Sequence, residues 1–348
     1  MKWRMLRTSD AADWNKVLSL FSRSDIYFLP DYHRVYELNG DGTAYAFVAE
    51  DGDRVLFYPF FLRAIEKVGG EPVGGEWTDI ETVRGHNGPL STTDDPAFLD
   101  GAWKQYFAWC DKHHVVAEFT RFNLYMDNQR YIHPSWTVIR HGEAVVLNLD
   151  RSEEELWTSY LSVQRNMVRK ALSKGLVCDE VPPAEGLNEF RRLYTETMDR
   201  VKALPAAYYS DAYFQALCSD LGGMVKLWTV RDRDRIVAAA MFLLYGDRIY
   251  YHLAGSDASQ RGSAPNNLLL HTVALWGRKN GYRSFFLGGG GGNKGIFDFK
   301  ASLSRERLGQ YIGRRIHNKE AYDRLCAQWM RQKGVSELPN YTFPYRMD

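Results

Sequence analysis

The segment with the most unusual chemistry is a run of five glycines followed by a lysine that lies between aromatic residues. It spans 285–304 and reads FFLGGGGGNKGIFDFKASLS. Glycines at the end of an apolar strand allow positive φ angles and let another group approach the backbone closely. The residues Ile296, Phe297 and Phe299 are too apolar for a loop without a function. We therefore interpret the segment as one wall of a pocket around Lys300, with a flexible surface loop as the alternative.

The glycine run does not fit the phosphate-binding loops that share its composition. A P-loop needs Gly-Lys-Ser/Thr at the start of a helix, whereas here Lys294 is followed by Gly295. The spacing Gly-x-Gly-x-x-Gly is present, but five glycines satisfy it by chance. No acidic residue ends a second strand about twenty positions later, as a dinucleotide site requires. A nucleotide-binding loop of either kind is therefore not expected.

An internal repeat organises the elements around this segment. YFLPDYHRVY from Tyr27 aligns with YYSDAYFQAL from Tyr208 at an offset of 181. At the same offset, YAFVAEDGDRVLFYPFFL from Tyr45 aligns with KLWTVRDRDRIVAAAMFL from Lys226. Each longer stretch alternates apolar residues around a tight turn and so predicts a β-hairpin. A duplicated domain explains one offset across two separated blocks.

A third pair of segments completes the repeat at a different offset. FAWCDKHHVVAEFTRF from Phe107 resembles ALWGRKNGYRSFFLGG from Ala274 at an offset of 167, and each predicts the end of an amphipathic helix followed by a strand. The first copy then carries about fourteen extra residues, for which 68–75 is the expected place. The predicted fold class is α/β (α+β), with tandem domains at 1–145 and 146–348. Each domain is expected to be a mixed sheet flanked by helices.

The segment that joins the two copies predicts one helix over 152–175. Ser152 and Glu155 form a capping box, and Gly175 supplies the C-terminal stop. Its expected apolar stripe is Leu156, Tyr160, Val163 and Met167. Its cationic residues are Arg165, Arg169, Lys170 and Lys174. They are either a solvated face that complements the helix dipole or an anion-binding face.

Composition excludes several classes of protein. The 348 residues carry a formal charge of +1, with 45% apolar and 14% aromatic residues, which is typical of a globular protein and not of a general nucleic-acid coat. No run of eighteen apolar residues and no signal peptide is present, so no membrane insertion is expected. The four cysteines lie far apart, which favours free thiols in a cytoplasmic protein and no metal site. Composition gives no indication of the oligomeric state.

The order of motifs resembles the Fem-type aminoacyltransferases. The resemblance is carried by IYYHLAGSDASQRGSAPNNLLLHTVALWGRKNGYRSFFLGGG with GIFDFKASLS in the second half, and by WTDIETVRGHNGPLS and EFTRFNLYMDN in the first. VQRNMVRKALSKGL, LYTETMDR and YIGRRIHNKEAYDRL are similar to further family segments. The resemblance covers nearly the whole chain. It implies two GNAT-like domains, which agrees with the repeat.

The resemblance also implies an activity and a set of site residues. Members move an amino acid from aminoacyl-tRNA to an amino group of a peptide or muropeptide-like acceptor, without a cofactor. Lys300 and Asp79 are the implied catalytic residues. The implied substrate-binding residues are Phe299, Tyr251, Arg200, Gly289, Gly290 and Arg305.

Other interpretations of these residues remain open. Lys300 could be a surface lysine, Asp79 a structural aspartate in a turn, and Tyr251 a core residue. Arg200 could belong to a surface ion pair. Catalysis assisted by the substrate itself would need no base from the protein.

Two other functions remain open at this point. Six cationic residues between 294 and 315 are opposed only by Asp298 and Glu306. Such a patch suits the phosphates of an RNA acceptor stem, and it also suits the pyrophosphate of an acyl-CoA donor. The expected acyl-CoA signature before the long helix is only half present in SQRGSAPNN. A non-catalytic binding protein on the same fold is the third interpretation.

Overall fold

The computed structural model describes residues 1–347, which separate into two compact units. Unit 1 combines Met1–His141 with the segment that begins at Gln310, and unit 2 is Gly142–Gly309. The predicted boundary at 145 lies close to the observed one. The prediction also placed 310–348 in the second domain, and here the structure differs, because the described part of this segment packs into unit 1.

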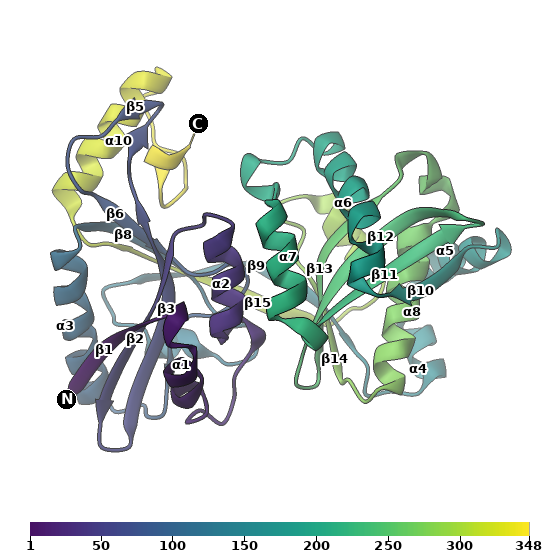
Figure 1. Cartoon of the computed structure of the whole chain (residues 1–348), viewed down its shortest axis with the longest axis horizontal. Coiled ribbons are helices and arrows are strands. Elements are labelled where there is room, and N and C mark those ends of the chain that lie inside the picture. The colour runs from purple at the N-terminus through teal and green to yellow at the C-terminus, as the bar shows by residue number, and fades with distance from the viewer. Residues whose placement is uncertain (348) are drawn as a thin grey trace. The chain divides into compact units, whose positions relative to one another are not determined.

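Unit 1 is a sheet with helices on both faces (Figure 1). Its strands, in spatial order, are β1 (Lys2–Arg7), β2 (Thr43–Asp51), β3 (Arg54–Ala64), β6 (Thr78–Glu81), β8 (Val115–Arg121) and β15 (Arg307–Ile316). β6 and β8 are parallel, and the other neighbours are antiparallel. Helices α1 (Ala11–Leu18) and α2 (Pro30–Leu38) cover one face, and α3 (Pro96–Lys112) covers the other. Short strands are β4 (Lys67–Val68), β5 (Glu71–Pro72) and β7 (Leu90–Ser91).

Unit 2 repeats this architecture (Figure 1). Its strands, in spatial order, are β10 (Val177–Val181), β11 (Val225–Asp232), β12 (Arg235–Tyr245), β13 (Arg248–Ser256), β14 (Ser284–Gly288) and β9 (Thr137–Asn148). Helices α5 (Ser162–Ser173) and α8 (Pro265–Lys279) cover one face, while α6 (Pro183–Arg200) and α7 (Asp211–Asp220) cover the other. Two short helices are α4 (Glu153–Ser159) and α9 (Lys294–Ala301). The 3₁₀ turns of the whole chain are Thr8–Asp10, Ile26–Phe28, Asn128–Tyr131, Pro205–Ala207, Gly222–Met224, Ala258–Ser263 and Pro344–Arg346.

The two units have the same strand connectivity, which confirms the predicted duplication. The hairpins β2–β3 and β11–β12 occupy equivalent positions and close with the pairs Asp51–Arg54 and Asp232–Arg235. The extra residues of the first copy form the β4–β5 hairpin, where the changed offset placed them. The mixed sheets flanked by helices are therefore those expected from the sequence.

The two copies exchange their last strands. β9 follows β8 in the chain but pairs with β14 of unit 2, with Ser284 opposite Asn148 and Phe286 opposite Val146. β15 follows β14 but pairs with β8 of unit 1, with Ile312 opposite Arg121. After β15, α10 (Lys319–Lys333) buries its apolar side in the core of unit 1. The exchange explains why the C-terminal segment belongs to the first unit.

The predicted helix over 152–175 is broken in the structure. The capping box is present, because Ser152 Oγ accepts from the Glu155 amide and the Glu155 side chain accepts from the Ser152 amide. The single helix is wrong, since α4 ends at Ser159 and α5 begins at Ser162. The Leu161 amide donates to the Ser302 carbonyl at 2.9 Å, which replaces an intrahelical bond. The break rotates the second half, so Val163 is exposed while Gln164, Val168 and Ala171 are buried.

A buried carboxylate holds the exchanged strand in unit 1. Glu118 on β8 is fully buried and accepts hydrogen bonds from Tyr58 at 2.5 Å and Tyr106 at 3.0 Å. The imidazole of His317, directly after β15, lies 2.8 Å from the other carboxylate oxygen. A buried carboxylate is costly unless its oxygens are hydrogen-bonded, so Glu118 depends on Tyr58, Tyr106 and His317 together.

Replacing this carboxylate should therefore destabilise unit 1. We predict that Glu118→Gln lowers the free energy of unfolding by about 3 kcal/mol, since the change leaves buried donors without a charged partner. Asp323→Asn is the control, because the Lys319–Asp323 pair on α10 is exposed and should contribute less than about 1 kcal/mol. Urea denaturation measures both. Equal, small effects would show that Glu118 does not fix β15.

Candidate functional site

A gap between two strands of unit 2 is the centre of the candidate site. The parallel strands β13 and β14 pair only from Arg248–Ser284 to Tyr250–Phe286. Beyond this point β13 stays with β12 as far as Ser256, and β14 stays with β9 through Gly288. The two strands therefore diverge after Tyr250, and no ladder pairing described for residues 1–347 joins β13 to β14 beyond this point.

A bulge lies on β13 at the mouth of this gap. Met241 of β12 is opposite Leu253, and the next residue, Phe242, is opposite Tyr251. His252 is therefore an extra residue with no opposite on β12. A bulge leaves a backbone group outside the ladder and re-aims the neighbouring residues, which is why bulges are frequent at binding sites.

The Lys300 side chain enters the gap from α9. Its ammonium donates to the Gly289 carbonyl at 2.7 Å and lies 5.8 Å from the centre of the Tyr251 ring. A Cβ on Gly288 would lie 3.3 Å from Lys300 Nζ, and the φ of Gly288 is +81°. The bare strand end thus makes room for the lysine as well as for any ligand.

The glycine run also allows the tight turn into α9. Asn293 caps the helix by accepting from the Ile296 amide at 3.1 Å. A Cβ on Gly290 would lie 2.4 Å from the Asn293 carbonyl oxygen, so no side chain fits there. Phe297 and Phe299 pack against the core of unit 2. The structure thus brings the glycines, Phe297 and Phe299 together around Lys300, and the role of this cluster as a pocket wall stays a prediction.

Burial changes the acid–base properties of the site. Loss of solvent around Lys300 lowers its pKa from 10.5 to about 8, so the ammonium and neutral forms are both accessible near neutral pH. Burial likewise raises the pKa of Tyr251, which remains a neutral phenol. A lysine with a lowered pKa in a partly closed gap is a candidate functional group.

Arg200 lies near the other end of β13. It donates to the Ser256 carbonyl at 3.1 Å and to Thr197 Oγ at 3.2 Å. Five residues of strand separate Tyr251 from Ser256, which is about 16 Å. Burial and the nearby Arg261 both lower the pKa of Arg200, and its Nε has no hydrogen-bond partner among residues 1–347. The structure therefore does not place Arg200 in the same contact set as Lys300.

The equivalent gap of unit 1 is closed. Beyond the last paired residues of β6 and β8, Glu81 and Phe119, the Thr82 amide donates to the Phe119 carbonyl at 3.1 Å and the Asn87 amide to the Arg121 carbonyl at 3.1 Å. A further bridge joins Asn87 and Phe122. No bulge interrupts the pairing of β3 with β6 in the described register. Only unit 2, within residues 1–347, keeps the open arrangement.

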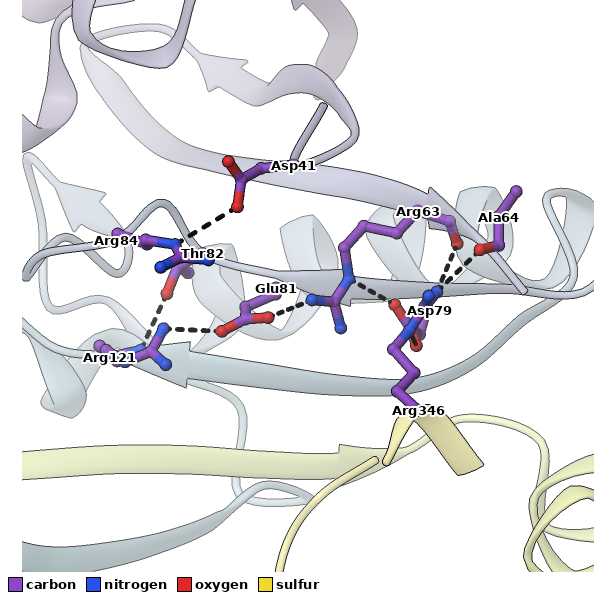
Figure 2. A network of polar contacts seen from close by, with 9 residues as sticks. All are labelled: Asp41, Arg63, Ala64, Asp79, Glu81, Thr82, Arg84, Arg121 and Arg346. Carbon is purple, nitrogen blue, oxygen red and sulfur yellow. Dashed lines mark hydrogen bonds and ion pairs between the residues drawn. The ribbon is translucent and has the colours of Figure 1, made fainter. Parts of the chain in front are cut away.

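Asp79 lies in unit 1 within a network of arginines, which Figure 2 shows. Its carboxylate is fully buried, with one oxygen 2.7 Å from Arg63 Nε and the other 2.5 Å from Arg346 Nε. Arg346 also donates to the Ala64 carbonyl at 2.9 Å. Both oxygens of Asp79 are thus engaged by guanidinium groups. This geometry favours a structural role over that of a free base.

Glu81 continues the network on the same strand. It pairs with Arg63 and, at 2.8 Å, with Arg121 (Figure 2). Burial alone would raise the pKa of Glu81, but the two arginines outweigh it and hold the pKa at about 2. Since the pKa is lower in the folded chain, the carboxylate stabilises unit 1 above about pH 4.5, and this contribution is lost as the pH falls toward 2.

The residues of the predicted basic patch are divided between the two units. Arg305 is exposed in unit 2, whereas Arg314 and Arg315 belong to unit 1. Arg315 stacks on Phe107 at 3.9 Å and contacts Trp136, so it is part of the packing of that unit. Lys294 is paired with Asp298 at 2.5 Å. Several of the cations counted along the sequence are therefore already engaged within their own unit.

Sequence reasoning missed two features of the site. The bulge at His252 has no signature in YYHLAGS, because a register shift depends on the partner strand. Arg261 was not singled out either, although it lies close enough to lower the pKa of Arg200. The half-matching SQRGSAPNN segment was a signal that could have directed attention to Arg261.

Residues 162–301 match the protein family described as "Acetyltransferase (GNAT) domain". The matched segment lies within unit 2. The match includes both diverging strands, α8, the glycine run and Lys300. The comparison therefore supports an acyltransferase of the GNAT type.

Solved structures share the fold of the whole chain. FemX superposes with a TM-score of 0.67 at 15% identity over 93% of this chain and 99% of its own. L-PGS from Bacillus licheniformis superposes with a TM-score of 0.51 at 14% identity, over 81% of this chain and 91% of its own. A third structure is the C-terminal domain of a protein described as a "Putative Lysylphosphatidylglycerol Synthetase" from Agrobacterium fabrum. It superposes with a TM-score of 0.55 at 12% identity, over 93% of this chain and 96% of its own. The predicted tandem GNAT fold and the likeness to Fem-type proteins are confirmed at the level of fold.

Two searches found nothing. No curated protein sequence matches this chain closely enough to count as a relative. Within residues 1–347, no helix has both the length and the apolar character to cross a membrane.

The two roles of Asp79 make different predictions. If it holds the arginine network, Asp79→Asn should lower the free energy of unfolding by about 3 kcal/mol, because the buried carboxylate that joins Arg63 to Arg346 is lost. Turnover per folded molecule should then stay near that of the parent. Asp100→Asn, in an exposed pair with Lys104, is the control. A hundredfold loss of turnover with unchanged stability would instead identify Asp79 as the base.

Proposed function

We propose that the protein transfers an aminoacyl group from aminoacyl-tRNA to the amino group of a peptide or muropeptide-like acceptor. The observation that carries the proposal is the partly dehydrated Lys300 ammonium, which lies in the gap between β13 and β14 beside the bulge at His252. An acyl carbonyl placed in this gap meets two kinds of donor. They are the lysine ammonium and the backbone amide freed by the bulge.

The reaction needs little else from the protein. The acceptor amine attacks the ester carbonyl, a C–N bond forms, and the C–O bond to the ribose breaks. The proton lost by the amine ends on the departing ribose hydroxyl. The carbonyl oxygen gains negative charge during this step, and a preplaced ammonium in a dry site stabilises it strongly. Positioning of the amine supplies much of the remaining rate.

The remaining site residues take supporting roles in this proposal. Phe299 shields the lysine from water, and Tyr251 forms the opposite wall of the gap. Gly289 orients the ammonium through its carbonyl, and Gly290 permits the turn. Arg200, with its unpaired Nε, is suited to a carboxylate or phosphate of the acceptor. The half-present acyl-CoA signature and the likeness to FemX favour the RNA donor.

An acyl-CoA donor is the second candidate function. It is favoured by the match of residues 162–301 to a family described as acetyltransferase. Transfer assays decide between the two. We expect acylation of an amine from charged tRNA and none from acetyl-CoA. Turnover with acetyl-CoA alone would replace the RNA donor.

The role of Lys300 can be tested by substitution. Lys300→Ala should lower turnover by about 10²–10³, the usual effect of losing one such donor, with little change in melting temperature. Lys300→Arg should rescue in part, because the guanidinium keeps the charge but not the shape. Near-normal turnover of the alanine variant would contradict the proposal.

The pH dependence gives a separate check on the same residue. The ammonium form is the active one, so turnover should fall as the pH rises through about 8. Lys300→Arg should lose this falling limb, since arginine stays charged. Rate profiles between pH 6 and 10 measure the effect. A limb that rises through 8 would indicate that the neutral amine acts as a base.

A further inference from the structure

A cavity of unit 2 lies beside the candidate site and is not used by the chemistry above. Its volume is about 730 Å³. It is bounded by the end of α4, the start of α5 and the segment that follows α9. The residues that matter for its chemistry are Arg151, Arg165, Arg305 and Glu306.

The cavity carries more positive charge than its own carboxylate can balance. Arg151 pairs with Glu306 at 2.5 Å. Arg165 donates to the carbonyls of Thr158 and Tyr160, and no carboxylate within residues 1–347 forms an ion pair with it. Arg305 is exposed and has no hydrogen bond or ion pair among the described residues 1–347. Two guanidinium groups with uncompensated charge around one hollow attract an anion.

The charge continues from the cavity along α5. Arg169 lies one turn after Arg165 on the same helix face, and both Arg169 and Lys170 are exposed. Arg169 stacks on Trp157 at 5.3 Å, which holds its side chain in place. The arrangement is a track of several cations and fits an extended polyanion better than a single phosphate.

The cavity is also close to Lys300 along the chain. Arg305 is five positions after Lys300, so their Cα atoms lie at most about 18 Å apart. The Leu161 amide, at the start of α5, is bonded to the Ser302 carbonyl at 2.9 Å and fixes the cavity to the end of α9. A ligand whose reactive end contacts Lys300 can therefore reach the cavity with its next phosphate groups.

We propose that this cavity binds backbone phosphates of the donor RNA, with Arg305 and Arg165 as the contacts and Arg169 continuing the path. The inference rests on the proposed function, because it assumes that the donor is an aminoacyl-RNA. Under this proposal, the cavity holds the phosphates of the RNA that lie next to its aminoacylated end. A phosphate of acyl-CoA has the same chemistry and is distinguished by experiment.

The test compares two donors that carry the same aminoacyl ester. One is an aminoacylated RNA hairpin with the sequence of an acceptor stem, and the other is 3′-O-aminoacyl adenosine, which has no phosphate. Arg305→Gln should reduce kcat/KM for the hairpin about tenfold more than for the adenosine ester, since one charged contact is lost. It should also lower the slope of log affinity for the uncharged hairpin against log salt by about one. Lys279→Gln, an exposed cation at the end of α8, is the matched control and should change neither quantity.

The possible outcomes are distinguishable. Equal effects of Arg305→Gln on both donors, with the salt slope unchanged, would overturn the cavity proposal and leave the proposed function intact. Transfer from acetyl-CoA with no transfer from either ester would overturn the RNA donor itself. A selective loss with the hairpin, repeated in Arg169→Gln, supports the track.

Discussion

The pairing of β14 with β9 is the constraint on which the candidate site depends. β14 keeps this partner through Gly288, while β13 keeps β12 through Ser256, so the two central strands must separate after Tyr250. β9 is available for this pairing only because the two copies of the domain exchange their last strands. A duplicated fold thus supplies the edge that holds the gap open.

An open gap between two strands must be filled, since unpaired backbone groups are costly when buried. In unit 2 the Lys300 ammonium donates a hydrogen bond to the Gly289 carbonyl. Lys300 is held there by α9, the helix that Asn293 caps. In unit 1 the same region is closed by backbone bonds, beside a network of buried carboxylates and arginines. The strand edge is therefore open in one copy of the fold and closed by backbone hydrogen bonds in the other.

Much of this arrangement could be predicted from the sequence, because it depends on local patterns. The hairpins, the capping box at Ser152 and the wall of glycines and aromatics around Lys300 follow from alternation, capping chemistry and side-chain size. The exchange of β9 and β15 could not be predicted, because either partner offers the same hydrogen bonds. The break at Tyr160–Leu161 depends on a carbonyl more than a hundred residues away, and the bulge at His252 depends on register with β12. The pairing of Asp79 with Arg63 depends on the register of β6 with β3, and Arg346 comes from the far end of the chain, so neither partner was visible in the residues around Asp79.

The central claim is that the gap holds Lys300 in a partly dehydrated state in which its ammonium can donate to a carbonyl oxygen. Titration of the lysine Cε resonances by NMR, with Lys300→Arg to assign the signal, measures this state directly. The structure predicts a midpoint near 8 for Lys300. A midpoint near the usual 10.5 would show a solvated lysine and would contradict the account.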